Sequence, residues 1–450
     1  MDFRSKMKFI NTTILTLIFL LFLLPINGTA QEGFFLPEGK KHGVINFELV
    51  NNLVLIPVTI NGSDFTFLLD TGSSHSVIFS FEAVDSLTLN NSTVIQLRGL
   101  SKDEPIMAVR SDNNVMEIGK AKNEDISLYV IFDGVLNFTS RLGVPIHGII
   151  GTDFFRDFIV HVNYSSRKIK FYNPKSYTPK KCRACVELPL IFINDKPYIE
   201  ANIETRESSL LVNLLIDSGS GDALWLFQDE KQLFIPEEAF DDYLGMGING
   251  DIFGKRHKLK QLSFSGFDFK NVNVAYPDVN FLRAQFLKGI DGSIGGEIFR
   301  RFNWVVDYQS KKILIKSNRY YKEPFHYNMS GITLEHGELT VVREKTIVNE
   351  NIINRDLHTE IPTIISNYEN FKLKLMPSYI ITEVRKNSPA HKAGLEPGDE
   401  LLEINDVPVH KYRLFEINNM FYTNEGSRMK LKVKRKTTVR TVRFILEDIK

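Results

Sequence analysis

Two short turns, far apart in the chain, each place an aspartate directly after an apolar run. Asp70-Thr71-Gly72-Ser73 follows residues 65–69, and Asp217-Ser218-Gly219-Ser220 follows residues 214–216. Burying a lone carboxylate beside an apolar strand is costly unless it is paired or hydrogen-bonded. One such turn would be an ordinary strand end. Two turns in matching surroundings are much stronger evidence for a function than one.

The segments downstream of the two turns also match. Residues 148–164 and 292–308 align without a gap at an offset of 144 (292 − 148), whereas the aspartates are 147 apart (217 − 70). A length difference of three residues between the intervening segments reconciles the two offsets. The repeat is far too long for a solenoid turn or a propeller blade, so it predicts two related lobes.

The N-terminus has the pattern of an export signal. Basic Arg4, Lys6 and Lys8 precede an apolar stretch over residues 14–24, and Gly28-Thr29-Ala30 supplies a small-residue cleavage site. This pattern predicts a signal peptide over residues 1–30, because the apolar stretch is short for a membrane span. An uncleaved anchor is the alternative. No later segment is long and apolar enough to predict a stable membrane span.

The charge balance argues against a nucleic-acid partner. The formal net charge is +1, which gives no electrostatic case for binding nucleic acid or an anionic membrane. The only two cysteines are Cys182 and Cys185. In an exported chain they form either a small disulfide or a reduced structural loop, and two ligands are too few for a cysteine-only zinc site.

Strand and turn patterns divide the mature chain into three parts. Residues 31–178 and 179–322 repeat one plan of short strands, and a segment rich in Lys, Pro and Tyr links them. Asn61-Gly62 predicts a hairpin turn in the first part. Residues 323–450 differ: a strand over 378–384, a helix over 414–422 and two closing strands are predicted there.

These motifs carry a resemblance to known families. The paired Asp-[Thr/Ser]-Gly turns with their later Ile-Gly segments resemble the lobes of pepsin-like and retropepsin-like aspartic proteases. Ser388-Pro389-Ala390, Ala393-Gly394-Leu395 and Pro397-Gly398-Asp399 resemble a PDZ domain. Together they resemble secreted bacterial aspartyl proteases with a C-terminal PDZ domain. The resemblance implies a mainly β, bilobal acid-protease fold followed by a PDZ-like domain with an insertion.

Two carboxylates that meet at a lobe junction have a defined chemistry. If Asp70 and Asp217 lie side by side, they cannot both ionise cheaply, and they hold one proton between them. One carboxylate then takes a proton from a water while the other polarises the peptide carbonyl. This reaction needs no metal and no cofactor, and none is expected.

Neighbouring residues are expected to support the two aspartates. Gly72 and Gly219 allow tight turns whose N–H groups reach the carboxylates. The resemblance implies that Thr71 and Ser218 hydrogen-bond across the lobe junction. Ser73 and Ser220 are predicted to donate hydrogen bonds to the aspartates.

Two substrate-binding elements are also expected. A flap hairpin that covers the substrate is predicted within residues 97–109, with Gly99 at its tip. In the PDZ-like domain, the peptide-receiving strand is predicted at residues 379–384, including Tyr379, Ile380 and Ile381, opposite the helix over 414–422. The loop before that strand has no glycine, so ligand capture and a purely structural role stay open.

The sequence therefore favours an exported aspartic endopeptidase, located in the periplasm, outside the cell or at the surface of a bacterium. Its partners would be a peptide or protein substrate and a C-terminal peptide bound by the PDZ-like domain. The rival is a catalytically inactive, protease-like receptor for peptides. Intact copies of both aspartates and both turns favour the enzyme. A structural envelope protein has no positive support.

Overall fold

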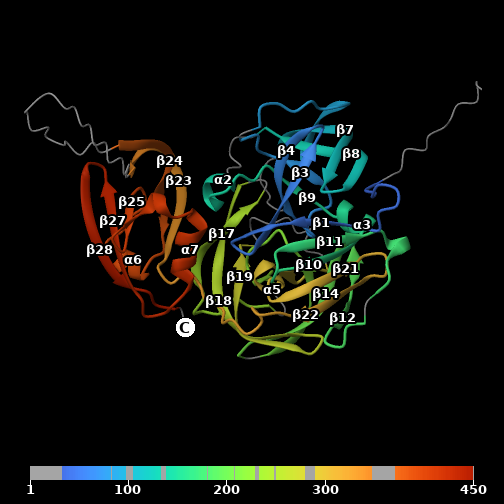
Figure 1. Cartoon of the computed structure of the whole chain (residues 1–450). Helices are drawn as coiled ribbons and strands as arrows, with labels where there is room; N and C mark the ends of the chain where they lie inside the picture. The colour runs from blue at the N-terminus through green and yellow to red at the C-terminus, as the bar shows by residue number, and fades with distance from the viewer. Residues whose placement is uncertain are drawn as a thin grey trace, which may run out of the picture.

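The computed structural model describes residues 33–82, 84–97, 105–132, 138–179, 181–206, 208–228, 233–247, 250–278, 289–346 and 370–448. The predicted signal peptide and Gly99 lie outside these ranges. Within them, no helix has the length and apolarity that crossing a bilayer requires. The fold is mainly β, as the sequence predicts (Figure 1).

Each half of the repeat folds into an eight-stranded sheet. In strand order, the first sheet contains β2 (Glu48–Val50), β3 (Leu53–Ile60), β4 (Ser63–Leu69), β9 (Gly148–Ile150), β5 (Ser76–Ile78), β8 (Ala121–Ile131), β7 (Ile106–Ile118) and β6 (Ser92–Leu97). The second contains β13 (Ile191–Ile193), β14 (Lys196–Glu204), β15 (Ser209–Ile216), β20 (Gly292–Ile294), β16 (Leu224–Leu226), β19 (Phe267–Pro277), β18 (Gly250–Phe264) and β17 (Phe240–Gly247).

The two sheets have the same topology, position by position. Even the additional pairing of β3 with β7 has its counterpart in β14 with β18. In both sheets the strand that ends at the aspartate, β4 or β15, pairs in parallel with a later strand, β9 or β20. The internal repeat predicted from the sequence is thus confirmed as two related lobes.

A third sheet joins the lobes around an approximate twofold axis. Its six strands are, in order, β1 (His42–Asn46), β11 (Lys168–Tyr172), β10 (Ile159–Asn163), β21 (Phe302–Asp307), β22 (Lys312–Ser317) and β12 (Val186–Pro189). Each lobe contributes three of them. At the centre His161 pairs with Val305, which is also its counterpart at the offset of 144 (305 − 161). A residue that faces its own repeat partner marks the position of the axis.

Local sequence explains the turns that deliver the aspartates. Asn61 and Gly62 adopt φ of 47° and 89°, which is the conformation of the predicted two-residue hairpin turn between β3 and β4. Short helices cover the lobes: α2 (Phe138–Leu142), α3 (Asp153–Asp157), α5 (Gly296–Phe299) and the 3-10 turn η1 (Pro174–Ser176). One apolar core runs through both lobes and the sheet between them, and fully buried Phe67, Phe154, Phe171 and Phe302 contribute to it.

The C-terminal part has its own sheet and its own apolar core. The sheet order is β23 (Ile332–Thr346), β24 (Asn370–Val384), β25 (Glu400–Ile404), β27 (Arg428–Arg435) and β28 (Thr438–Ile445), with β26 (Val407–Pro408) beside β25. The helices are α6 (Pro389–Lys392), η3 (Val409–Lys411) and α7 (Leu414–Tyr422). The predicted insertion begins as an extension of the β23–β24 hairpin, where Thr346 still pairs with Asn370.

The predicted peptide-receiving strand is wrong. Tyr379, Ile380 and Ile381 lie on β24, whose two edges are occupied: Tyr379 pairs with His336 of β23 on one side and with Leu401 of β25 on the other. A strand that already has two neighbours cannot accept a third. The strand at the end of the sheet, next to α7, is β23, and the loop before it (residues 328–331) contains Gly331 at a φ of 78°.

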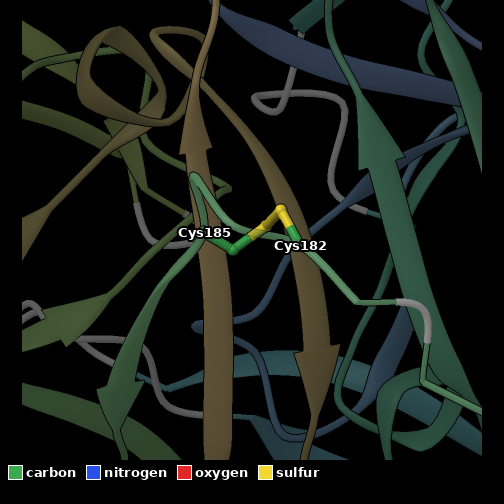
Figure 2. Close-up of a disulfide and its surroundings, with 2 residues drawn as sticks. All are labelled: Cys182 and Cys185. Atoms are coloured by element: carbon green, nitrogen blue, oxygen red, sulfur yellow. A yellow bond between two sulfur atoms is a disulfide. The ribbon is translucent and has the colours of Figure 1, made fainter.

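Cys182 and Cys185 form a disulfide with an S–S distance of 2.04 Å (Figure 2). The bridge closes a short, largely exposed loop between the last strand of the first lobe and β12. Of the two states that the sequence left open, the structure therefore contains the bridged one.

Candidate active site

The two aspartates meet at the junction of the lobes. A Cβ atom added to Gly72 would lie 2.9 Å from Oδ1 of Asp217 and 3.2 Å from Oδ1 of Asp70. A Cβ atom added to Gly219 would lie 2.4 Å from Cγ of Asp70. Only glycine leaves room for carboxylates this close to the backbone. The structure thus brings Asp70 and Asp217 together, as the repeat predicts.

Backbone N–H groups hold each carboxylate in place. Gly72 N donates to Oδ1 of Asp70 at 2.7 Å, and Gly219 N donates to Oδ1 of Asp217 at 3.0 Å. The two glycines therefore do what the sequence predicts. They close a tight turn and present a donor to the acid two residues earlier.

Thr71 and Ser218 lock the turns to each other through reciprocal bonds. Thr71 Oγ1 donates to Ile216 O at 2.6 Å, and Ser218 Oγ donates to Leu69 O at 2.7 Å. In return, Ser218 N donates to Thr71 Oγ1 and Thr71 N donates to Ser218 Oγ, both at 3.0 Å. Each hydroxyl thus reaches the backbone of the opposite lobe, and this arrangement fixes the distance between the two aspartates.

The Ile-Gly segments support the turns from behind. Asp70 N donates to Ile150 O and Asp217 N donates to Ile294 O, both at 3.0 Å. Gly295, like the corresponding glycine of the first lobe, lies against the turn so closely that an added Cβ would lie 2.4 Å from Asp222 O. Both segments lie beside the aspartate turns, as the sequence predicts.

The predicted role of Ser73 is wrong. Its hydroxyl donates to the carbonyl of His75 at 2.8 Å and so stabilises its own turn instead of reaching an aspartate. Ser220 lies in the second turn, where its N–H donates to Asp217 O at 3.3 Å. This bond reaches the backbone carbonyl of Asp217, whereas the carboxylate of Asp217 accepts from Gly219 N.

The environment favours protonation of the pair. Burial, and after it the charge of Asp70, raises the pKa of Asp217 to about 7. Burial also raises the pKa of Asp70, although the N–H of Gly72 and the charge of Lys196 act in the opposite direction. At neutral and mildly acidic pH the pair therefore binds one proton more readily than two separate aspartates would.

Lys196 is a residue that sequence reasoning missed. It follows the Asn194-Asp195 turn, where β14 begins, and its charge lowers the pKa of both Asp70 and Asp217. The corresponding turn of the first lobe is Asn51-Asn52, and the residue after it is Leu53. The repeat could therefore have located this position beside the dyad. The repeat could not have indicated that a positive charge acts on the dyad from this position, because the first lobe has a leucine there.

A large cleft runs past the dyad. It has a volume of about 2020 Å³, and Asp70, Asp217 and Lys196 line it. The hairpin of β6 and β7, where Leu97 pairs with Ile106, lies at the position predicted for the flap, and Leu97 also lines the cleft. The β17–β18 hairpin is the equivalent element of the second lobe, and it contributes Tyr243 and Phe253.

The C-terminal domain packs against both lobes at the rim of this cleft. Arg141 of α2 forms salt bridges with Glu335 of β23 at 2.9 Å and with Asp251 of β18 at 3.0 Å. Lys258 of β18 bonds with Asp448 at 3.1 Å. These contacts tie the first lobe, the second lobe and the C-terminal sheet together around the site.

Comparison with known families agrees with this architecture. Residues 56–154 match a family model described as aspartyl protease, and residues 380–435 match one described as PDZ domain. The chain contains an aspartyl protease domain and a C-terminal PDZ domain. The aspartyl protease match lies within the first lobe. The second lobe is not matched, but its sheet has the same topology as the sheet of the first lobe. No curated protein matches the chain.

The raised pKa of Asp217 has a consequence for stability. A carboxyl group whose pKa is higher in the folded protein than in the unfolded chain adds stability below the unfolded value, and this stability is lost as pH rises through the folded value. Here the window runs from 3.8 to about 7. We expect the Tm of the unmodified protein, relative to Asp217→Asn, to fall by a few degrees between pH 4 and pH 8.

Thermal unfolding of both proteins across this pH range measures the effect. Other buried acids whose pKa is raised, such as Asp157 and Glu297, are present in both proteins and cancel, so the difference reports the pair of Asp70 and Asp217. A Tm difference that stays constant from pH 4 to pH 8 would contradict the raised pKa of Asp217.

Proposed function

We propose that this protein is an aspartic endopeptidase that hydrolyses peptide bonds with water activated by Asp70 and Asp217. One observation carries the proposal. The two carboxylates meet at the axis between the lobes, each bonded to a glycine N–H, in an environment that raises the pKa of both. A binding protein would have no need of this costly arrangement.

The geometry supports a mechanism without a covalent intermediate. The pair holds one proton, so one carboxylate accepts a proton from a water placed between them while the carboxylic acid donates to the carbonyl oxygen of the substrate. Water adds to the carbonyl carbon, and the amine leaves with a proton that passes through the dyad. Because the two groups titrate as a unit, neither aspartate has a fixed role.

We also propose that the protein is exported to the periplasm, the surface or the surroundings of a bacterium. The basic and apolar N-terminal pattern and the Cys182–Cys185 bridge support this, since disulfides persist in oxidising compartments. N-terminal sequencing of the purified protein tests the proposal. We expect cleavage close to Ala30, and an intact N-terminus would contradict it.

Digestion of a diverse peptide library between pH 3 and pH 8 tests the enzymatic function. We expect cleavage at internal bonds and inhibition by a peptide with a secondary alcohol in place of the scissile carbonyl. We also expect activity to fall as pH rises above about 7, where the pair of aspartates loses its shared proton. Peptides that bind in the cleft but stay intact at every pH would favour an inactive, protease-like receptor.

A further inference from the structure

Residues of α7 and β23, the two elements that border the expected peptide groove of the PDZ domain, line the same cleft as the dyad. Phe415, Asn418 and Tyr422, spaced along one face of α7, line the same cleft as Asp70 and Asp217. Residues 331–334, at the start of the edge strand β23, line it as well. In Figure 1, α7 lies on the side of the PDZ domain that faces β17 and β18, and β28 lies on the far side.

The size of this cleft indicates a polypeptide ligand. Its volume of about 2020 Å³ exceeds the roughly 300–1,000 Å³ of sites for small molecules. The dyad, the β17–β18 hairpin and α7 all line this one cleft. An extended chain bound at the aspartates therefore lies in the same cleft as the residues of α7.

Four N–H groups at the start of β23 and in the loop before it are not free to bind a terminal carboxylate. The Oδ1 atom of Asn328 accepts bonds from Ser330 N and Gly331 N, both at 3.0 Å. Ile332 N donates to Ser330 Oγ at 3.0 Å, and Met329 N donates to Phe421 O at 2.8 Å. Capture of a C-terminus requires free N–H groups at this position. These four N–H groups are all bonded within the protein.

The other end of the groove is closed by the first lobe. Arg141 of α2 pairs with Glu335 of β23, and Gly143 packs so tightly against Leu414 that an added Cβ would lie 2.4 Å from Leu414 Cβ. The groove is therefore bordered by the protease lobes, and a peptide in it has to continue along the cleft.

The free polar groups of α7 suit a peptide backbone. The carboxamides of Asn418 and Asn419 have no hydrogen-bond partner within the described part of the chain, and Asn418 lies half-buried in the cleft. A carboxamide both donates and accepts, so it can pair with the N–H and C=O groups of an extended chain whatever its side chains are. These two residues can therefore hold a segment without selecting its sequence.

We propose that the catalytic cleft and the PDZ groove form one channel, in which the groove binds an internal segment of the same polypeptide that is cleaved at the dyad. The proposal rests on the peptidase function proposed above and extends it. The substrate class is an extended polypeptide chain, and its free C-terminus is not required.

A series of peptides of increasing length tests the channel. All of them share one cleavage sequence, and they are extended on either the N-terminal or the C-terminal side of it. We expect kcat/KM to rise, through a lower KM, once the extension reaches α7 on one of the two sides. Amidation of the peptide C-terminus should leave this gain in place. In Asn418→Ala/Asn419→Ala, the ratio of kcat/KM for long and short peptides should fall several-fold towards one. Asn202→Ala, an exposed asparagine of β14 outside the cleft, is the matched control.

The outcomes separate the channel from the peptidase function. A gain that survives in the double variant overturns the channel, and a gain that disappears on amidation shows C-terminal capture instead. If no peptide is cleaved, the peptidase function fails, and fluorescence anisotropy of the long and short peptides then tests the channel alone. Tighter binding of the long peptide that is lost in the double variant would support it, and equal binding would overturn it.

Discussion

Replacing either Asp70 or Asp217 by asparagine should lower kcat/KM for peptide cleavage by about 100- to 10,000-fold, the usual contribution of a positioned acid or base. Asparagine keeps the shape of the side chain, and its oxygen still accepts from the N–H of Gly72 or Gly219. It cannot exchange a proton with water, however. The loss therefore reports chemistry and not folding.

The losses of kcat/KM caused by the two substitutions should not be additive. Because one proton belongs to the pair, removing either carboxylate already removes the function, and the double variant should be about as inactive as each single variant. Asp157→Asn is the matched control, since Asp157 is a partly buried aspartate that accepts from Phe34 N away from the cleft. Substantial cleavage by either single dyad variant would contradict the proposed mechanism.

Thr71→Val should destabilise the junction of the lobes by about 2 kcal/mol or more. Thr71 is only 4% exposed, and its hydroxyl donates to Ile216 O and accepts from Ser218 N. Valine has nearly the same shape but leaves both groups unpaired, and each buried, unsatisfied group costs about 1–3 kcal/mol. Chemical denaturation measures this loss, and kcat should fall with it because the distance between the aspartates is no longer fixed.

A conservative variant separates the hydroxyl from the shape of the side chain. Thr71→Ser should retain most of the stability and activity, because Ser218 already makes the equivalent bonds in the second lobe. Thr93→Val is the control, because Thr93 lies at an exposed position on β6 and its hydroxyl has no partner among the described residues. If Thr71→Val is as stable as the unmodified protein, the reciprocal bonds do not hold the lobes together.

Much of the architecture could be predicted from the sequence because it depends on local signals that occur twice. The apolar runs before Asp70 and Asp217 identify two strands that end at small turns, and the offset of 144 identifies two lobes with one topology. The bounds of α7, residues 414–422, follow from local pattern in the same way. Such features depend on neighbours in the chain, so the chain alone reveals them.

Features that depend on distant neighbours could not be predicted. Whether β23 or β24 lies at the edge of the PDZ sheet depends on the pairing of strands separated by the insertion. The sequence therefore wrongly predicts that Tyr379, Ile380 and Ile381 belong to the edge strand that receives a peptide. The hydroxyl of Ser73 donates to the carbonyl of His75 and not to a carboxylate, a choice between acceptors that depends on the geometry of the folded turn. The charge of Lys196 acts on the dyad because its turn lines the same cleft, and the sequence of the first lobe, with Leu53 at that position, does not reveal this.

The sequence by itself determined the two lobes, the paired aspartates and the PDZ domain that follows them, because repeated motifs encode all three. Only the tertiary structure decided that α7 and the start of β23 line the same cleft as the dyad and that Ser330 N and Ile332 N are already bonded within the protein. The physical reason is that docking of domains depends on a few contacts between distant residues, such as Arg141 with Glu335. No local pattern in the chain records such contacts.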